Sequence, residues 1–248
     1  CYTYQADVYQ SYESDKIALD LYNQALRLDS SNINTFFNRA SLYTNIHNDH
    51  TKANKEFSRI IDKKPAFADA YHARGLTYFR RKMYTEAIVD FNKAIELDST
   101  QQVYIVDKTQ AFKGILSSEN ALEQISGLIE LYPMDVQAYL YRTSLYRAMQ
   151  DNDKALKDFT TIIDINRNDF MGYMWRAAFY YSLGQYENSL ADYTRVIDIC
   201  PDHSVAYSFR GVLYENMKDF DKALADYSYS LQLREAPLTY FYRGNVYI

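Results

Sequence analysis

Residues 172–201 read GYMWRAAFYYSLGQYENSLADYTRVIDICP, and residues 206–235 read AYSFRGVLYENMKDFDKALADYSYSLQLRE; the two align after a shift of 34 residues. Each has an aromatic residue, two further residues and an arginine near its start, and a second aromatic four residues after the arginine. Residues 70–99 and 138–167 follow the same pattern. Self-similarity at a fixed period of this length indicates a repeat protein.

Each repeat unit carries two apolar stripes with the spacing i, i+3, i+4, i+7, which predicts a pair of amphipathic helices. Small residues, Gly75 with Ala87 and Gly211 with Ala223, stand where the two helices of a unit must approach closely. A single pair cannot bury its apolar face, so neighbouring pairs are expected to stack into a continuous core.

The pattern resembles the tetratricopeptide repeat, with an aromatic at position 4, small residues at 8 and 20, aromatics at 11 and 24, and Pro near 32. Here Arg-Gly or Arg-Ala often fills positions 7 and 8. The resemblance implies an all-α, right-handed α-solenoid of helix–turn–helix repeats with a concave groove lined mainly by each unit's first helix. We expect one array, a fragment of a longer chain, with about seven repeats and one truncated repeat. The expected units are 1–32, 33–67, 68–101, 102–135, 136–169, 170–203, 204–236 and the partial unit 237–248.

Composition excludes several classes of function. A net charge of −5 disfavours a nucleic-acid binder, which needs a basic surface. No apolar stretch approaches the roughly 20 residues that span a bilayer, so we expect no membrane insertion. Two cysteines, Cys1 and Cys200, cannot form a disulfide framework. We expect a cytoplasmic location, with a cytoskeletal or ciliary assembly as a further option.

The arginines at position 7 fall on the side of the first helix that carries the aromatics of every unit. A guanidinium buried there needs a carboxylate partner. An acid stands sixteen residues later in four units, and Glu56 is in register with Arg39 once one extra residue is allowed. Pairing with the preceding unit's acid fits the sequence less well. We therefore predict structural ion pairs within units rather than ligand sites: Arg39–Glu56, Arg74–Asp90, Arg142–Asp158, Arg176–Asp192 and Arg210–Asp226.

The opposite face of the first helices holds positions 2, 5, 6, 9, 12 and 13, which line the concave surface in the family that the chain resembles. Large rings and methionines at these positions favour a protein-binding groove. Trp175, at position 6, either docks a partner or packs against the neighbouring unit. The predicted groove residues are Phe37, Asn38, His72, Phe79, Arg80, Leu140, Tyr141, Met171, Met174, Trp175, Tyr181, Ser208 and Phe209.

Family members that hold the C-terminal carboxylate of chaperones use a set of Lys, Asn and Arg residues in three successive units. Only Asn38 matches that set, so we expect no such carboxylate clamp. Arg80, Lys113 and Arg147 remain available for an acidic segment. His47, Asp49 and His50 have a spacing that can touch a metal but lack a further ligand. We therefore predict no catalytic residue, no metal site and no cofactor.

These observations predict a non-enzymatic scaffold or adaptor that binds a helix or extended segment of a partner protein, within a multiprotein assembly. The alternative is a substrate-targeting or regulatory arm of an enzyme whose catalytic domain lies outside this sequence. A purely structural spacer is the third possibility.

Overall fold

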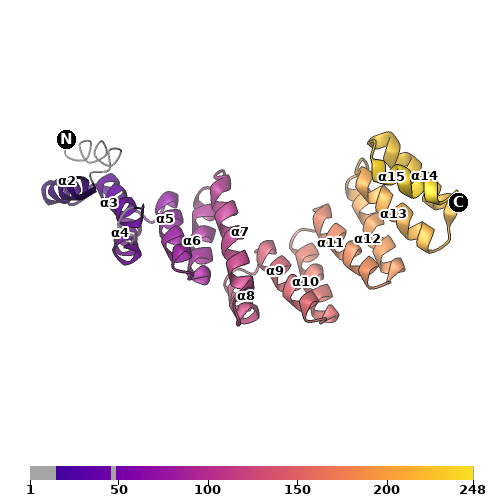
Figure 1. Cartoon of the computed structure of the whole chain (residues 1–248), viewed down its shortest axis with the longest axis horizontal. Coiled ribbons are helices and arrows are strands. Elements are labelled where there is room, and N and C mark those ends of the chain that lie inside the picture. Colours follow the sequence, from indigo (N-terminus) through magenta and orange to yellow (C-terminus); the bar gives the residue numbers. More distant parts are fainter. Residues whose placement is uncertain (1–14, 46–48, 248) are drawn as a thin grey trace. The chain divides into compact units, whose positions relative to one another are not determined.

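The computed structural model describes residues 15–45 and 49–247; the first half of the expected first unit, residues 1–14, and His47 lie outside them. All regular structure in the described ranges is α-helical, and no strand occurs there (Figure 1). The all-α prediction is confirmed. The chain forms two compact units, Cys1–Leu131 and Tyr132–Ile248, which we call unit 1 and unit 2.

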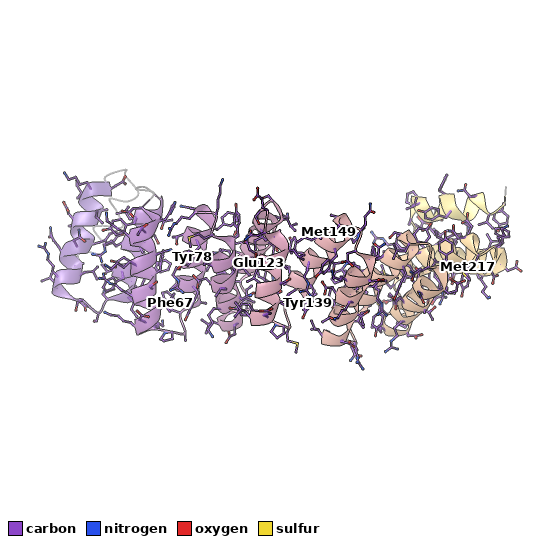
Figure 2. The ribbon with its side chains drawn as sticks, turned by 90° about the horizontal axis from the view of Figure 1, so that it is seen from below. Phe67, Tyr78, Glu123, Tyr139, Met149 and Met217 are labelled. Atoms are coloured by element: carbon purple, nitrogen blue, oxygen red, sulfur yellow. The ribbon has the colours of Figure 1, made fainter. Side chains whose placement is uncertain are left out.

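Unit 1 is a succession of helices in which each packs against the next in sequence. Its helices are α2 (Asp15–Leu28), α3 (Ile33–Asn45), α4 (His50–Lys63), α5 (Ala68–Arg80), α6 (Tyr84–Leu97), α7 (Gln102–Leu116) and α8 (Ala121–Leu131). Figure 2 labels Phe67, which directly precedes α5, and Tyr78, which lies in its last turn.

Unit 2 has the same kind of helical-hairpin arrangement within itself. Its helices are α9 (Val136–Ala148), α10 (Asn152–Ile165), α11 (Phe170–Ser182), α12 (Tyr186–Ile199), α13 (Ser204–Asn216), α14 (Phe220–Leu233) and α15 (Pro237–Asn245). Each described hairpin is therefore a first helix of 13 to 15 residues and a second of 11 to 14, which is the expected solenoid unit.

Four of the turns inside the hairpins are closed by residues in the left-handed conformation. Lys82, Gln150, Gly184 and Lys218 have φ of 60°, 58°, 71° and 63°. The next residue's N–H then bonds back to the carbonyl of the tyrosine five positions before it, as Asp219 N does to Tyr214 O at 2.8 Å. This closure satisfies the carbonyls at the end of the first helix and reverses the chain within two or three residues.

The core of each hairpin lies where small residues of the first helix meet rings of the second. Ala177 and Ala206 are fully buried, and Tyr193 and Tyr227 retain at most 2% of their exposure. Gly75 and Gly211 leave no room for a side chain, because a Cβ on either would lie 2.6 Å from the ring of Phe91 or Tyr227. Close approach of the two helices thus requires a small residue here.

Candidate functional site

The structure brings every predicted arginine and acid together. In unit 2, Arg176 donates from Nε and Nη2 to the two carboxylate oxygens of Asp192, both at 2.8 Å. Arg142 with Asp158, Arg210 with Asp226 and, in unit 1, Arg74 with Asp90 form the same two-pronged pair. Arg39 donates to Glu56 through Nη2 at 2.7 Å. Bidentate geometry of this kind holds both side chains in place.

The predicted groove residues differ in exposure. Arg80, Met171, Tyr181 and Phe209 are exposed. Ser208 is buried, with 9% exposure. The half-buried members are Phe37, Asn38, His72, Phe79, Leu140, Tyr141, Met174 and Trp175.

Two residues at position 5 serve the packing of the core. Phe37 packs against the buried cluster of α3 and α4, with its ring centroid 5.5 Å from that of Phe57. Met174 packs against the cluster that contains Ala177 and Tyr193. These two position-5 side chains therefore have less surface left for a partner than the exposed Tyr181 and Phe209.

A first pocket, which we call the Trp175 pocket, opens between α9 and α11 in unit 2 and has a volume of about 230 Å³. Its lining comes from positions 5, 8, 9, 12 and 24 of the repeat at 136–169, and from positions 6, 9 and 10 of the next repeat, at 170–203. The lining residues are Leu140, Thr143, Ser144, Arg147, Phe159, Trp175, Ala178 and Phe179. Trp175 thus borders a hollow and is half-buried.

A second pocket, the Phe209 pocket, lies between α13 and α15 and has a volume of about 270 Å³. Phe209 and Leu238 stand beside it with 39% and 56% of their surface exposed. Ser208 lies within it, and its Oγ is 2.7 Å from both Ser230 Oγ and Thr239 Oγ1. The buried hydroxyls are thus paired with one another beneath an apolar rim.

Comparison with known proteins identifies the repeat in parts of the chain. The sequence pattern of the tetratricopeptide repeat matches residues 68–101, and a second pattern of the same repeat matches residues 172–203 and 205–237. This chain contains tetratricopeptide repeats. They generally mediate protein–protein interactions, and their fold is typically that of a non-catalytic interaction scaffold. None of the curated proteins compared matches the chain in sequence.

One solved structure supports the fold, and two others are similar to a lesser degree. The C-terminal part of a TPR repeat-containing protein from Cytophaga hutchinsonii is 16% identical, with a TM-score of 0.55 over 97% of this chain and 98% of that one. A tetratricopeptide repeat protein from Parabacteroides merdae is 14% identical, with a TM-score of 0.46 over 100% and 98%. YrrB, described as a TPR protein with an unusual peptide-binding site, is 16% identical, with a TM-score of 0.40 over 90% and 97%.

The arginines of these tetratricopeptide repeats make a further bond that the sequence analysis missed. In three of them, Nη1 donates to a polar side chain on the second helix of the preceding repeat. The bonds are Arg39 to Asn23 Oδ1 at 2.8 Å, Arg74 to Ser58 Oγ at 2.9 Å and Arg176 to Thr160 Oγ1 at 3.0 Å. The sequence contains a signal for them, since each acceptor directly follows the aromatic of position 24. These arginines therefore join two repeats as well as two helices.

Aromatic rings of positions 4 and 11 flank the same guanidinium groups. The Arg210 guanidinium lies 5.4 Å from the ring centroid of Tyr207 and 6.0 Å from that of Tyr214. The hydrogen bond that Arg210 donates to Asp226 raises the pKa of Arg210 further above its usual value. Nε and Nη2 of Arg210 are thus engaged by Asp226 and two tyrosine rings lie beside its guanidinium, which fits the predicted structural role.

Burial raises the pKa of Asp90 even though Arg74 binds it. Loss of hydration thus outweighs the attraction of Arg74 for the charged carboxylate. A raised acid pKa favours the protonated form in the fold, so the ionised pair costs stability at neutral pH relative to low pH. The pair is accordingly better explained by geometry and specificity than by net attraction.

We expect Ser58→Ala to lower the free energy of unfolding by about 1 kcal/mol, because it removes an acceptor from a half-buried charged donor. Ser144→Ala is the matched control, since Ser144 is exposed in mid-helix and its hydroxyl binds only its own helix at Tyr141 O. Both changes gain the same helix propensity. Urea unfolding followed by circular dichroism measures the difference, and equal stability of the two variants would show that the bond between repeats contributes nothing.

His72 takes part in a contact between repeats of unit 1. Its Nε2 lies 2.7 Å from Asp107 Oδ2, and its ring centroid is 4.6 Å from that of Tyr104. Tyr104 donates its hydroxyl to Asp69 Oδ1 at 2.6 Å. Burial, followed by the bond to Asp69, raises the pKa of Tyr104 above its ordinary value. Asp69, His72 and Asp107 stand at positions 2, 5 and 6 of their repeats, which the sequence assigned to the groove face. Here they take part in contacts that join α5 to α7.

Metal-binding groups are lacking in the described part of the chain, where no three His, Cys, Asp or Glu side chains could hold an ion together. Burial and the nearby charges of Arg80 and Arg81 lower the pKa of His50, and neighbours of that sign disfavour a cation. No helix in the described ranges is long and apolar enough to cross a membrane.

Proposed function

We propose that this chain is a non-enzymatic scaffold or adaptor that binds a segment of a partner protein along unit 2, within a multiprotein assembly. The observation that carries the proposal is the pair of hollows between the first helices of consecutive repeats. The Trp175 pocket and the Phe209 pocket each place large apolar side chains beside an opening. In protein interfaces, a few large side chains that become buried, often aromatic ones, supply most of the binding free energy.

The size of the pockets favours a protein partner. Cavities that enclose a cofactor or metabolite usually measure about 300–1,000 Å³. Volumes of about 230 and 270 Å³ suit single side chains of a docked segment. Exposed Tyr181 extends the apolar surface beyond the hollows, and exposed Phe209 borders one of them.

Photo-crosslinking in cells tests the proposal. A benzophenone amino acid placed at Ala178 or Phe209 should crosslink to the same partner, because both residues border the pockets. The matched control is Phe220, which is 48% exposed at the start of α14 and lines neither pocket. Phe209→Ala should reduce the crosslink from Ala178, whereas Phe220→Ala should leave it unchanged. Crosslinks from Phe220 alone would place the interaction on another face and contradict the proposal.

A further inference from the structure

Arg147 is the one charged residue that lines the Trp175 pocket. Its guanidinium lies 5.3 Å from the ring centroid of Phe179 and is exposed. Within residues 15–45 and 49–247, no carboxylate lies within ion-pair distance of it, whereas its neighbours Arg142 and Lys154 are bound to Asp158 and Asp151. The ring restricts where the guanidinium lies, while its N–H groups stay available.

The other polar groups of the pocket have little to donate. Thr143 gives its hydroxyl proton to Tyr139 O at 2.8 Å, and Ser144 gives its proton to Tyr141 O at 2.7 Å. The walls are apolar, formed by Leu140, Phe159 and Phe179 together with the indole of Trp175. A polar group inside the pocket would lose its hydration without gaining strong partners. An apolar side chain is the favoured occupant, and an acceptor is favoured only at the rim.

We infer that the Trp175 pocket binds a partner segment in which a bulky apolar side chain lies within a turn of a carboxylate. The apolar side chain enters between Leu140, Trp175 and Phe179, and the carboxylate receives the N–H groups of Arg147. The inference rests on the proposed function, and it adds the chemistry of the partner. Since the whole chain has a net charge of −5, the selectivity for an acid comes from this local cation and not from long-range attraction.

Selection from a random twelve-residue peptide library displayed on phage, with the full chain as bait, tests this chemistry. Enriched peptides should combine Asp or Glu with Leu, Ile, Met or Phe at a spacing of one to four residues. Trp175 is the only tryptophan in the chain, so binding of a synthetic enriched peptide should change the intrinsic fluorescence in a saturable way.

Variants of Arg147 separate a charge effect from a packing effect. Arg147→Met keeps a long apolar stem over Phe179. This variant should bind the enriched peptide about five- to tenfold more weakly than the unmodified chain does. Arg147→Glu should abolish this binding and shift preference to the peptide whose acid is replaced by Lys. The matched control is Arg167→Met, because Arg167 is exposed in the same unit and binds only Asp164 in its own turn. Its affinity for the peptide should equal that of the unmodified chain.

Two results would overturn the inference. One is enrichment of apolar peptides without acids that bind Arg147→Met as well as the unmodified chain; the groove proposal would then survive. The other is a selection that yields no peptide able to change Trp175 fluorescence, while crosslinks at Phe209 persist. Loss of crosslinks at both Ala178 and Phe209 is the separate result that removes the proposed function itself.

Discussion

Arg176→Met with Asp192 left in place should lower the free energy of unfolding by about 3–5 kcal/mol, because it leaves a buried carboxylate without a partner. The Asp192 side chain is only 8% exposed, and both of its oxygens accept from Arg176. Thr160 of the preceding repeat loses its bond to the same guanidinium. The loss should therefore reduce the coupling between repeats as well as the stability of one hairpin.

The double variant Arg176→Met, Asp192→Leu should recover most of that stability, to within about 1 kcal/mol of the unmodified chain, since no unpaired charge remains buried. Arg167→Met is the surface control and should cost less than about 0.5 kcal/mol. Chemical unfolding followed by circular dichroism compares all four proteins. Equal stability of the single and double variants would contradict the ion-pair argument.

Gly211→Ala should destabilise the chain by about 1–3 kcal/mol through overpacking, although alanine favours helices. A Cβ at this position would lie 2.6 Å from Cε1 and 2.8 Å from Cδ1 of Tyr227. Tyr227 cannot easily give way, because its side chain is fully buried and its hydroxyl donates to Glu215 Oε2 at 2.7 Å. The melting temperature should fall, and the near-ultraviolet circular dichroism of the tyrosines should change.

Gly127→Ala provides the matched control for this prediction. Gly127 lies inside α8, and no atom stands within 4 Å of a Cβ built on it. This substitution should stabilise the chain by about 0.5–1 kcal/mol, because only the helix propensity changes. If Gly211→Ala and Gly127→Ala moved the melting temperature in the same direction, close approach of α13 and α14 would not be the reason for a glycine at 211.

The periodic pattern predicted the helical hairpins because each unit repeats the same solution to the burial of its apolar face. The partners of the arginines were also predictable, since an acid recurs sixteen residues later and lapses where the arginine does. The bond from Arg74 to Ser58 was missed, because a small polar residue on a second helix is a weak signal by itself. Only the stacking of one repeat on the next brings these two side chains together.

The groove shows where a helical wheel is insufficient. Met174 and Trp175 are adjacent on the predicted groove face, yet Met174 packs on the core while Trp175 borders a pocket. The wheel describes one helix, whereas exposure depends on the neighbouring helices. The position of α9 beside α11 decides which of the two side chains borders the pocket. A pattern within one repeat carries no information about the space between these helices.

The sequence by itself determined the repeat, the pairing of its helices and the choice of ion pairs, because these depend on spacing within about 34 residues of one chain. The tertiary structure decided which apolar side chains line the Trp175 pocket, and which arginine beside it lacks a carboxylate partner among the described residues. Arg142 and Arg147 lie five residues apart on one helix, and one is bound to Asp158 while the other faces a hollow. Their difference arises from the packing of separate helices, which brings an acid to one guanidinium and leaves the other beside the ring of Phe179.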